Sequence, residues 1–486
     1  MAKPKFYITT AIDYVNSDPH LGHAYEKILA DFIARWKRLN GFDVFFLTGT
    51  DENASKVAKA AREEGAKTIK DIQKFVDAKA ERFKELCKAL NIDYSFFIRT
   101  TDKKHKKKAA HFFKLLYENG FLYKEKYKGF YCLNCEAFYN QPFCPVHQTQ
   151  LKEIEEENYF FKLSLFKDKL MEIIKDYVFP EKYANEIIKR LKAEELKDLS
   201  VSREKLKWGI KVPFDKKQTI YVWIDALSNY ITALDWPNGR KFKKYWPADI
   251  HLIGKDINWF HSVIWPSLLL ALNIELPKKL FVHGFVTLEG EKLSKARRIV
   301  VDPFDLVKKY GCDVLRFYLI ASTSEGEDIG FDEDKIIKSN NELADKLGNL
   351  ITRVIGLAKE NKIEKCRIKK KEKIFVEQAI KEIHQHFDRY EFNLGMKKIM
   401  EVLDFFNKYI QNHKLWELEE KQLNQHLYFI CEGIRLITLL LYPAMPSTSL
   451  TIAKLYGFEI KSMKDCKFGK KKEYFLKEKE ILFKKI

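Results

Sequence analysis

Short apolar runs and amphipathic stretches alternate along the first part of the chain. Residues 5–12 (KFYITTAI) are β-branched and aromatic and predict a buried strand. Residues 25–39 then carry apolar side chains at helical spacing. Residues 42–53 (FDVFFLTGTDEN) predict a second buried strand, which we expect to stop at Thr48-Gly49. Strand, helix and strand in this order predict a β-α-β unit and hence a parallel sheet.

The same kind of pattern returns in the second half of the chain. Residues 219–227 (TIYVWIDAL), 249–256 (DIHLIGKD) and 280–288 (LFVHGFVTL) are expected to be strands, and residues 260–272 a helix. From about residue 333 the apolar spacing is helical throughout. We therefore predict a doubly wound α/β domain split by an insertion and followed by a helical domain. The expected limits are 1–117 and 216–332 for the two α/β halves, 118–215 for the insertion and 333–486 for the helices.

Composition narrows the class of protein. The 486 residues are 46% hydrophobic, enough for a large core and more than one domain. Lys and Arg total 87 against 68 Asp and Glu, a formal charge of +19 that favours nucleic acid or an acidic membrane surface, unless the lysines are simply solvated. The N-terminal residues lack a secretory pattern, and the apolar run LITLLLYPAM stops at Pro443, so we expect a cytoplasmic protein with no membrane partner. The eight Cys do not suggest a disulfide framework for so long a chain.

Two short motifs carry candidate chemistry. His20 and His23 flank Gly22 where the first helix is expected to begin, a place where free N–H groups and the helix dipole attract anions. Gly22 leaves room for a ligand to approach the backbone, although polar residues are common at helix starts in any case. In the loop 289–298, Lys292 and Lys295 are spaced to hold a triphosphate and its leaving pyrophosphate.

These motifs resemble a known family. HLGH is similar to the HIGH signature of class I aminoacyl-tRNA synthetases, and KLSKA to their KMSKS loop. Further segments, found in the same order along essentially the whole chain, narrow the resemblance to the methionyl-tRNA synthetases. They are FLTGTDEN (46–53), YCLNCEAFY (131–139), ENYFFKLS (157–164), YVWIDALSNY (221–230), GKDINWFH (254–261) and VHGFVTLEGEKLSK (282–295).

The resemblance implies a class I synthetase fold and a two-step reaction. The carboxylate of L-methionine attacks the α-phosphorus of ATP, which carries Mg²⁺, and the methionyl group then passes to the terminal adenosine of tRNA(Met). No protein nucleophile is needed, so catalysis should rest on positioning and charge stabilisation. The residues expected to act in catalysis are His20, His23, Asp51, Arg203, Lys292 and Lys295. The ATP site would comprise His20, Gly22, His23, Gly254, Asp256, Lys292, Ser294 and Lys295.

The resemblance also implies an amino-acid pocket with aromatic walls. Such walls suit a polarizable thioether. Asp51 would anchor the substrate ammonium, with Arg203 as its active-site partner. The pocket would be formed by Ile12, Tyr14, Asp51, Trp223, Ala226, Tyr230 and His283.

The insertion carries a candidate zinc site. Cys132 and Cys135 are separated by two residues, as are Cys144 and His147, which gives the Cys3His set of a zinc knuckle. Four protein ligands leave no open position on the metal, so the expected Zn²⁺ is structural.

The helical end resembles the family's anticodon-binding domain. Asn349 and Arg353, four residues apart, and Trp416 match the residues expected to read the anticodon of tRNA(Met). Stacking on an aromatic ring combined with hydrogen bonds suits splayed, single-stranded bases.

Several positions depart from the family pattern. Leu293 and Ala296 alter the lysine loop, Asn53 and Ala54 stand where His and Gly are common, and Leu415 stands where Pro is frequent. The chain ends without the further tRNA-binding domain of some relatives, so we expect a monomer. The alternatives are a class I synthetase for cysteine, leucine or valine, or a non-enzymatic, zinc-containing RNA-binding module. The DALSNY and TGTDEN segments argue against the first, and the intact histidines and lysines against the second.

Overall fold

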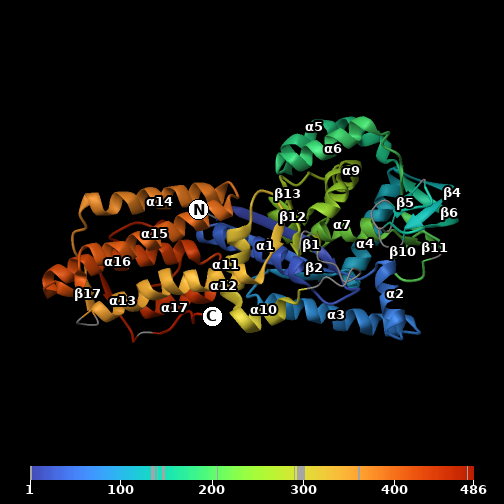
Figure 1. Ribbon diagram of the computed structural model, residues 1–486. Helices are drawn as coiled ribbons and strands as arrows, with labels where there is room; N and C mark the ends of the chain where they lie inside the picture. The colour runs from blue at the N-terminus through green and yellow to red at the C-terminus, as the bar shows by residue number, and fades with distance from the viewer. Residues whose placement is uncertain are drawn as a thin grey trace.

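The structure is a computed structural model, and it describes most of the chain. The described residues are 3–132, 137–139, 141–144, 148–204, 206–288, 291–292, 301–358, 362–478 and 480–486. A central sheet lies in the middle of the molecule, with the helical domain at one end and the insertion at the other (Figure 1).

The central sheet has six parallel strands in the order β3-β2-β1-β12-β13-β7. From β1, β2 and β3 follow on one side of the sheet and β12 and β13 on the other, so a topological switch point lies between β1 and β12. Sheets of this kind leave a ligand crevice there, at the carboxyl ends of the strands. The strands are β1 (Lys5–Tyr14), β2 (Asp43–Asp51), β3 (Phe96–Arg99), β7 (Val178–Phe179), β12 (Ile250–Gly254) and β13 (Leu280–His283).

Both faces of this sheet are buried, which explains the continuous apolar runs of its strands. Alternate residues of a strand point to opposite faces. In β1, Phe6 and Ile8 join one hydrophobic cluster while Tyr7 joins another. The helices of the α/β region are α1 (Leu21–Leu39), α2 (Ser55–Glu63), α3 (Ile69–Ala89), α4 (Lys103–Glu118), α7 (Val222–Thr232), α8 (Arg240–Tyr245), the 3₁₀ turn η2 (Lys255–Ile257), the π-helical η3 (Phe260–Ile264), α9 (Trp265–Ala271), α10 (Pro303–Tyr310) and α11 (Cys312–Ser322).

The insertion is built on an antiparallel sheet in the order β5-β4-β6-β8. Its elements are β4 (Leu122–Cys132), β5 (Ala137–Tyr139), β6 (Lys152–Phe161), η1 (Leu163–Phe166), α5 (Lys167–Tyr177), α6 (Glu181–Ala193) and β8 (Leu199–Ser200). A smaller sheet, β10-β11-β9, follows and leads back to α7. Its strands are β9 (Ser202–Arg203), β10 (Lys211–Val212) and β11 (Asp215–Ile220).

A third small sheet, β15-β14-β16, connects the α/β region to the helical domain. Its strands are β14 (Val286–Leu288), β15 (Glu291–Lys292) and β16 (Ile329–Phe331). The helical domain comprises α12 (Glu333–Leu343), the π-helical η5 (Ala344–Gly348), α13 (Asn349–Leu357), α14 (Lys370–Asp388), α15 (Phe392–Asn412), η6 (Leu415–Glu417), α16 (Glu420–Leu441), α17 (Pro446–Leu455) and η7 (Met463–Asp465). Among the described helices, none is long and apolar enough to cross a membrane.

The parallel α/β sheet and the helical C-terminal region confirm the predicted fold class at this level. One predicted strand is wrong: β11 ends at Ile220, and residues 222–232 form the helix α7. Every residue of α7 is buried, so its sequence lacks the one-sided apolar spacing by which helices are recognised. The predicted domain limits stay a prediction, although β7, within 118–215, belongs to the central sheet.

Two further expectations need correction. The segment 280–288 forms two strands in different sheets, separated at Gly284, where a Cβ would lie 2.1 Å from the carbonyl oxygen of Glu327. The region after 333 also contains an antiparallel ribbon of β17 (Lys362–Glu364) and β18 (Glu473–Phe475), which helical spacing did not predict.

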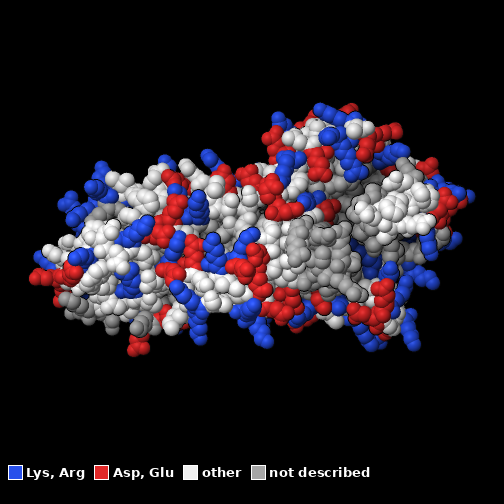
Figure 2. All heavy atoms as spheres, in the orientation of Figure 1, with Lys and Arg blue, Asp and Glu red and all other residues white. Residues whose placement is uncertain are grey.

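The excess of basic residues does not form one continuous stripe on the face shown in Figure 2. Lys and Arg alternate with Asp and Glu over much of this face, on the α/β region and on the helical domain alike. Basic side chains gather near the start of α14, where the exposed Lys369, Lys370 and Lys371 lie. Any polyanion on this face would therefore meet a mixed surface, apart from that end of the helical domain.

Candidate active site

Two histidines cap the first turn of α1, the first helix after β1 along the chain. His20 is the N-cap residue in an extended conformation, and its Nδ1 accepts a hydrogen bond from the N–H of Gly22 at 3.1 Å. The Nδ1 of His23 accepts in turn from the N–H of His20 at 3.1 Å. Because each Nδ1 is an acceptor, the neutral rings carry their proton on Nε2. Both imidazoles are thus fixed as donors at a helix N-terminus, beside the switch point of the sheet.

Gly22 is required by this arrangement itself. A Cβ at this position would lie 2.9 Å from Cε1 of His20. We expected a glycine here because it lets a ligand approach the backbone closely. The structure adds a second reason, because the glycine also leaves room for the imidazole of His20.

A buried chain of charges runs from the end of β1 to the end of β13. Lys27 Nζ lies 2.6 Å from Asp13 Oδ2 and 4.0 Å from Glu26 Oε1, and His283 Nε2 lies 3.1 Å from Glu26 Oε2. Burial lowers the pKa of Lys27, but the attraction of Asp13 and Glu26 outweighs it and the net shift is upward, so the ammonium stays charged. Of these four residues, only His283 was predicted from the sequence. The signal available for the two on α1 was the position of a charged residue on the buried side of an amphipathic helix.

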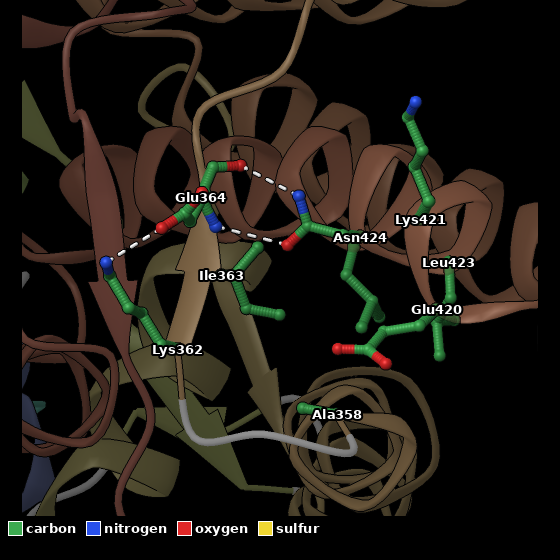
Figure 3. Close-up of a pocket in the computed structure, with 9 residues that line it drawn as sticks. Ala358, Lys362, Ile363, Glu364, Glu420, Lys421, Leu423 and Asn424 are labelled. Carbon is green, nitrogen blue, oxygen red and sulfur yellow. Dashed lines mark hydrogen bonds and ion pairs between the residues drawn. The ribbon is translucent and has the colours of Figure 1, made fainter.

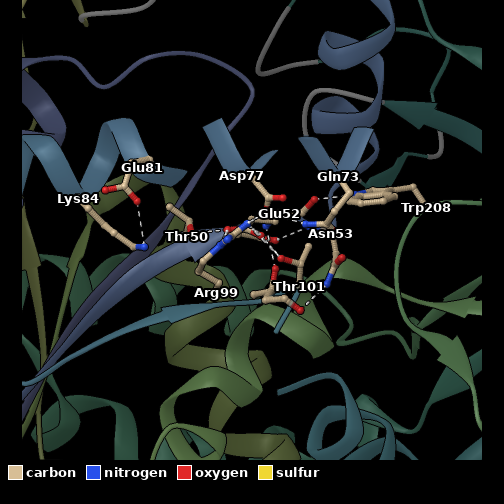
Figure 4. Close-up of polar contacts among 12 residues, drawn as sticks. Thr50, Glu52, Asn53, Gln73, Asp77, Glu81, Lys84, Arg99, Thr101 and Trp208 are labelled. Carbon is tan, nitrogen blue, oxygen red and sulfur yellow. Dashed lines mark hydrogen bonds and ion pairs between the residues drawn. The ribbon is translucent and has the colours of Figure 1, made fainter. Parts of the chain in front are cut away.

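The end of β2 is held rigidly around the predicted ammonium anchor. Asp51 is buried and lies beside Tyr14 in register. The next residue, Glu52, accepts from Arg99 Nε at 2.7 Å and Nη2 at 3.0 Å, and its carbonyl oxygen accepts from Trp208 Nε1 at 2.7 Å (Figure 4). These bonds fix the backbone on which Asp51 stands.

Asn53, one of the departures from the family pattern, ties β2 to α7. Its Nδ2 donates to Asp225 Oδ2 at 2.7 Å and to the carbonyl oxygen of Thr100 at 3.0 Å. Asp225 Oδ1 lies 2.6 Å from His105 Nε2, and His105 Nδ1 lies 2.7 Å from Thr232 Oγ1. None of these partners was predicted from the sequence.

Several residues predicted for the amino-acid pocket lie on α7 or in contact with it. The ring of Trp223 stacks on Phe260 with centroids 3.7 Å apart and planes at 11°, and it meets the edge of Tyr14 at 6.4 Å. Tyr230 Oη lies 2.7 Å from His261 Nε2. Ala226 is buried on the same helix, and Ile12 is half-buried near the end of β1.

Phe260 and His261 were missed by the site prediction, although both stand in the quoted GKDINWFH segment. The Nδ1 of His261 donates to the carbonyl oxygen of Ile257 at 3.0 Å, so its Nε2 is free of a proton and accepts from Tyr230. Burial lowers the pKa of His261 to about 4, which keeps the ring neutral near pH 7.

Arg203 lies on β9, in the small sheet beside α7. Its Nη1 donates to the carbonyl oxygen of Ser202 at 2.7 Å and to Ser200 Oγ at 2.9 Å, and its guanidinium lies 4.4 Å from the ring centre of Tyr221. The loop that follows reaches β2 through the bond from Trp208 to Glu52. Arg203 and Asp51 thus belong to neighbouring, connected segments.

Three of the remaining ATP candidates can be placed: Gly254 ends β12, Asp256 lies in η2 and Lys292 lies on β15. A Cβ on Gly254 would lie 3.0 Å from Asp256 Oδ1 and 3.7 Å from His283 Cε1, so this glycine keeps the end of β12 open. Lys292 pairs with Thr287 across β14 and β15, and only its backbone is described. Ser294 and Lys295 lie outside the described residues.

Half of the predicted zinc ligands can be placed. Cys132 and Cys144 are buried in one small cluster with Leu151, at the end of β4 and in the turn before β6. The carbonyl oxygen of Cys144 accepts from the N–H of Gln148 at 2.8 Å. Cys135 and His147 lie outside the described residues, within which no cluster of three metal-binding side chains occurs. Two buried thiols brought together from separate segments fit a thiolate metal site.

The three predicted anticodon residues lie in the helical domain, on α13 and η6. Asn349 is exposed at the start of α13, Arg353 follows one turn later, and Trp416 on η6 is 52% exposed. The π-helical turn η5 directly precedes Asn349. Asn407 of α15 donates to the carbonyl oxygen of Lys346 in that turn at 2.9 Å, an anchoring contact that the sequence did not reveal.

A pocket of about 420 Å³ opens beside these elements, between the end of α13, β17 and the start of α16. Figure 3 shows the amide of Asn424 bonded to the backbone of Glu364 at one wall, with N–H···O at 3.1 Å and N–H···O=C at 3.2 Å. Lys421 and Glu420 stand at its rim (Figure 3).

Comparisons with known proteins agree with this geometry. The family model described as "tRNA synthetases class I (M)" matches residues 6–153 and 140–355, and that of the "Anticodon-binding domain of tRNA ligase" matches residues 375–485. A methionine–tRNA ligase of Thermotoga maritima is 42% identical over 95% of this chain and 76% of its own length. One of Rickettsia conorii is 39% identical over 91% of each chain.

A solved structure is also similar over nearly its full length. The methionyl-tRNA synthetase of Mycobacterium tuberculosis, in complex with methionyl-adenylate, superposes with a TM-score of 0.93 and 34% identity, covering 99% of this chain and 100% of that one. The parallel α/β sheet and the helical domain are therefore arranged here as in that solved enzyme. The chain belongs to the methionyl-tRNA synthetases, a family of class I aminoacyl-tRNA synthetases.

Proposed function

We propose that this chain activates L-methionine with ATP and transfers the methionyl group to the 3′-terminal adenosine of tRNA(Met), for translation initiation and elongation. The observation that carries the proposal is the pair of imidazoles at the start of α1, each fixed as an Nε2 donor at the switch point of the sheet. A binding module without catalysis would not need two tautomer-locked donors at a helix N-terminus, where anions bind.

In the activation step, an oxygen of the methionine carboxylate bonds to the α-phosphorus of ATP while the bond to the β-phosphate breaks and pyrophosphate leaves. The protein supplies positioning and charge stabilisation. His20 and His23 donate to the phosphates, with Gly22 between them, while Lys292 and Lys295 neutralise the leaving pyrophosphate. Ser294 and the segment from Gly254 to Asp256 complete the nucleotide site, which takes ATP as its Mg²⁺ complex.

Asp51 anchors the substrate ammonium, and Arg203 stands opposite it in the active site. The burial of Asp51 and the bonds that hold Glu52 and Asn53 support this role, because a charge that must orient a substrate needs a rigid backbone. Loss of one such stabilising group is expected to cost about 2.7–4 kcal/mol of barrier, as for a donor in an oxyanion hole.

The side chain of methionine lies among Ile12, Tyr14, Trp223, Ala226, Tyr230 and His283. Because Tyr230 Oη is bonded to His261, the hydroxyl is already satisfied and the wall presents mainly apolar, polarizable surface. Such a pocket separates methionine from an analogue lacking one methylene by only about 1–3 kcal/mol.

The tRNA step uses the helical domain. Asn349, Arg353 and Trp416 read the anticodon, and the zinc knuckle of Cys132, Cys135, Cys144 and His147 gives the insertion its shape. Structural Zn²⁺ bound by four protein ligands contributes folding energy, and the burial of Cys132 and Cys144 in one cluster supports such a site. Since all these residues come from one copy of the chain, we propose that a monomer is active, in the cytoplasm, where translation takes place.

Amino-acid-dependent ATP–pyrophosphate exchange, measured with all twenty amino acids, tests the activity. We expect exchange with methionine alone, and we expect His20→Ala to lower kcat about 10²–10³-fold. His111→Ala, which alters an exposed histidine on α4, is the matched control and should leave kcat unchanged. Exchange with cysteine, leucine or valine would keep the reaction and overturn the pocket. No exchange from folded protein would favour the RNA-binding module instead.

A further inference from the structure

We propose that His105 is a positioning residue for methionine binding, which acts through Asp225 and Asn53. This inference rests on the proposed function, because it concerns how that same pocket is held. His105 comes from α4, which contributes none of the residues assigned to the pocket. Both of its ring nitrogens nevertheless form hydrogen bonds with side chains of α7, the helix that carries part of the proposed pocket.

Asp225 is a buried acidic residue with a hydrogen-bond partner at each side-chain oxygen. Its side chain is 1% exposed, and a buried carboxylate is tolerated only when its oxygens are hydrogen-bonded. Oδ1 lies 2.6 Å from His105 Nε2, and Oδ2 accepts from Asn53 Nδ2 at 2.7 Å. The two oxygens therefore join α4 on one side to the end of β2 on the other. A carboxylate only accepts here, so His105 must be the donor of its bond.

The hydrogen-bonded bridge from His105 through Asp225 to Asn53 lies beside the proposed amino-acid pocket. Asp225 stands on α7 between two residues of the amino-acid pocket, Trp223 and Ala226. Asn53 follows the ammonium anchor Asp51 by two residues, and its N–H donates to Asp51 Oδ1 at 3.3 Å. The bridge thus sets the separation between the group that holds the ammonium of methionine and the wall that holds its side chain.

His105 is itself held by a second contact to α7. Its Nδ1 lies 2.7 Å from Thr232 Oγ1, about two helical turns after Asp225 on α7. Two contacts to the same helix fix both the position and the rotation of the imidazole. The nucleotide candidates lie on α1, β12 and β15, and none of the hydrogen bonds of His105 reaches those elements.

Removing His105 should therefore impair methionine binding more than ATP binding. We expect His105→Ala to raise the KM for methionine about tenfold in pyrophosphate exchange and to leave the KM for ATP within twofold. His105→Gln, whose amide can donate to Asp225, should recover part of the loss. Thr232→Val, which keeps the imidazole and removes its support, should fall between Ala and wild type.

Glu432→Gln is the matched control for a general loss of stability. Glu432 is a fully buried carboxylate in the helical domain, bonded to Arg435 and Tyr474. The control should lower the unfolding midpoint and leave the KM for methionine unchanged. An equal rise of both KM values in His105→Ala, or an unchanged KM for methionine, would overturn the proposal.

A double-mutant comparison provides the test if His105→Ala does not fold. Asn53→Ala and His105→Gln remove or weaken opposite ends of one bridge, so their effects should not add. We expect the double variant to raise the KM for methionine about as much as Asn53→Ala alone. Multiplied effects would show two independent contacts and contradict the bridge. If the wild-type protein exchanges pyrophosphate with methionine while these variants behave independently, only this inference fails; absence of exchange in the wild type would refute the proposed function itself.

Discussion

Arg316 Nη2 lies 2.6 Å from Asp31 Oδ2, and neither side chain is exposed. Asp31 stands on α1, the helix that begins with the two signature histidines. Arg316 also donates to the carbonyl oxygens of Pro443 at 2.8 Å and Ala444 at 2.8 Å, just beyond α16. One guanidinium thus fastens the active-site helix to the last long helix of the helical domain.

Replacing Arg316 should destabilise the contact between α1 and the segment that follows α16. Burial raises the pKa of Asp31, but Arg316 and Arg35 outweigh it and the net shift is downward, so the carboxylate is charged. Arg316→Met leaves that charge with a single cation and removes the donor of three buried carbonyl oxygens, those of Leu90, Pro443 and Ala444. We expect a loss of about 3–5 kcal/mol in the free energy of unfolding, measured by urea titration.

An exposed ion pair is the appropriate comparison. Glu327 lies 2.6 Å from Lys182, and both side chains are well exposed. Glu327→Gln should change the free energy of unfolding by less than about 1 kcal/mol. Equal effects of the two substitutions would mean that the buried junction contributes no more than a surface contact.

A buried histidine predicts how stability depends on pH. The pKa of His261 is lowered by burial from 6.5 to about 4. The unfolded chain binds this proton below pH 6.5, whereas the native protein does so only near pH 4. Stability that is present above pH 6.5 is therefore lost as the pH falls towards 4, by about 3 kcal/mol for this group. Urea titrations at several pH values measure the loss.

His261→Gln should flatten that dependence. The amide can still accept a bond from Tyr230, but it does not titrate, so the loss between pH 6.5 and 4 should shrink by about 3 kcal/mol. The exposed His111 supplies the control, since His111→Gln should leave the slope as it is in the wild type. An unchanged slope in His261→Gln would show that this histidine titrates normally in the native state.

The fold and the location of the site were predictable because local signals agree there. Strands buried on both faces are continuous apolar runs, and His20 stands where such a strand gives way to a helix. The carboxyl ends of β1, β2 and β13 then lie at one edge of the sheet because the strands are parallel, and α7 is joined to the end of β2 by the bond from Asn53 to Asp225. The helix α7 was mistaken for a strand since burial on all sides erases its periodicity.

The supporting contacts were not predictable in the same way. His105 and Asp225 are 120 residues apart, and Glu26 meets His283 across 257 residues. Nothing in either local sequence specifies such a partner, because the pairing arises only when the elements pack. The one usable signal was polar residues at positions that an apolar helix should bury, such as Lys27 on α1. That signal marks a residue that needs a partner without naming the partner.

Zinc content tests the insertion. We expect one Zn²⁺ per purified chain and less than one after Cys144→Ser, because the substitution removes a thiolate from a four-ligand structural site. Cys312→Ser, at a half-buried cysteine of α11, should keep the full zinc content. Limited proteolysis should cut the segment between β4 and β6 faster in Cys144→Ser or after chelation. One Zn²⁺ retained in Cys144→Ser would place the metal elsewhere.

Replacing Trp416 should distinguish the two steps of the proposed reaction. Its ring is 52% exposed on η6, far along the chain from the catalytic residues, and stacking of one base on an aromatic ring contributes about 1–3 kcal/mol. Trp416→Ala should therefore lower kcat/KM for aminoacylation of tRNA(Met) about 10–100-fold and leave pyrophosphate exchange unchanged. Phe375→Ala, at an aromatic residue of α14 that is 42% exposed, should affect neither step. A parallel loss of exchange in Trp416→Ala would assign this tryptophan to the stability of the domain, and an unchanged aminoacylation rate would remove it from the anticodon site.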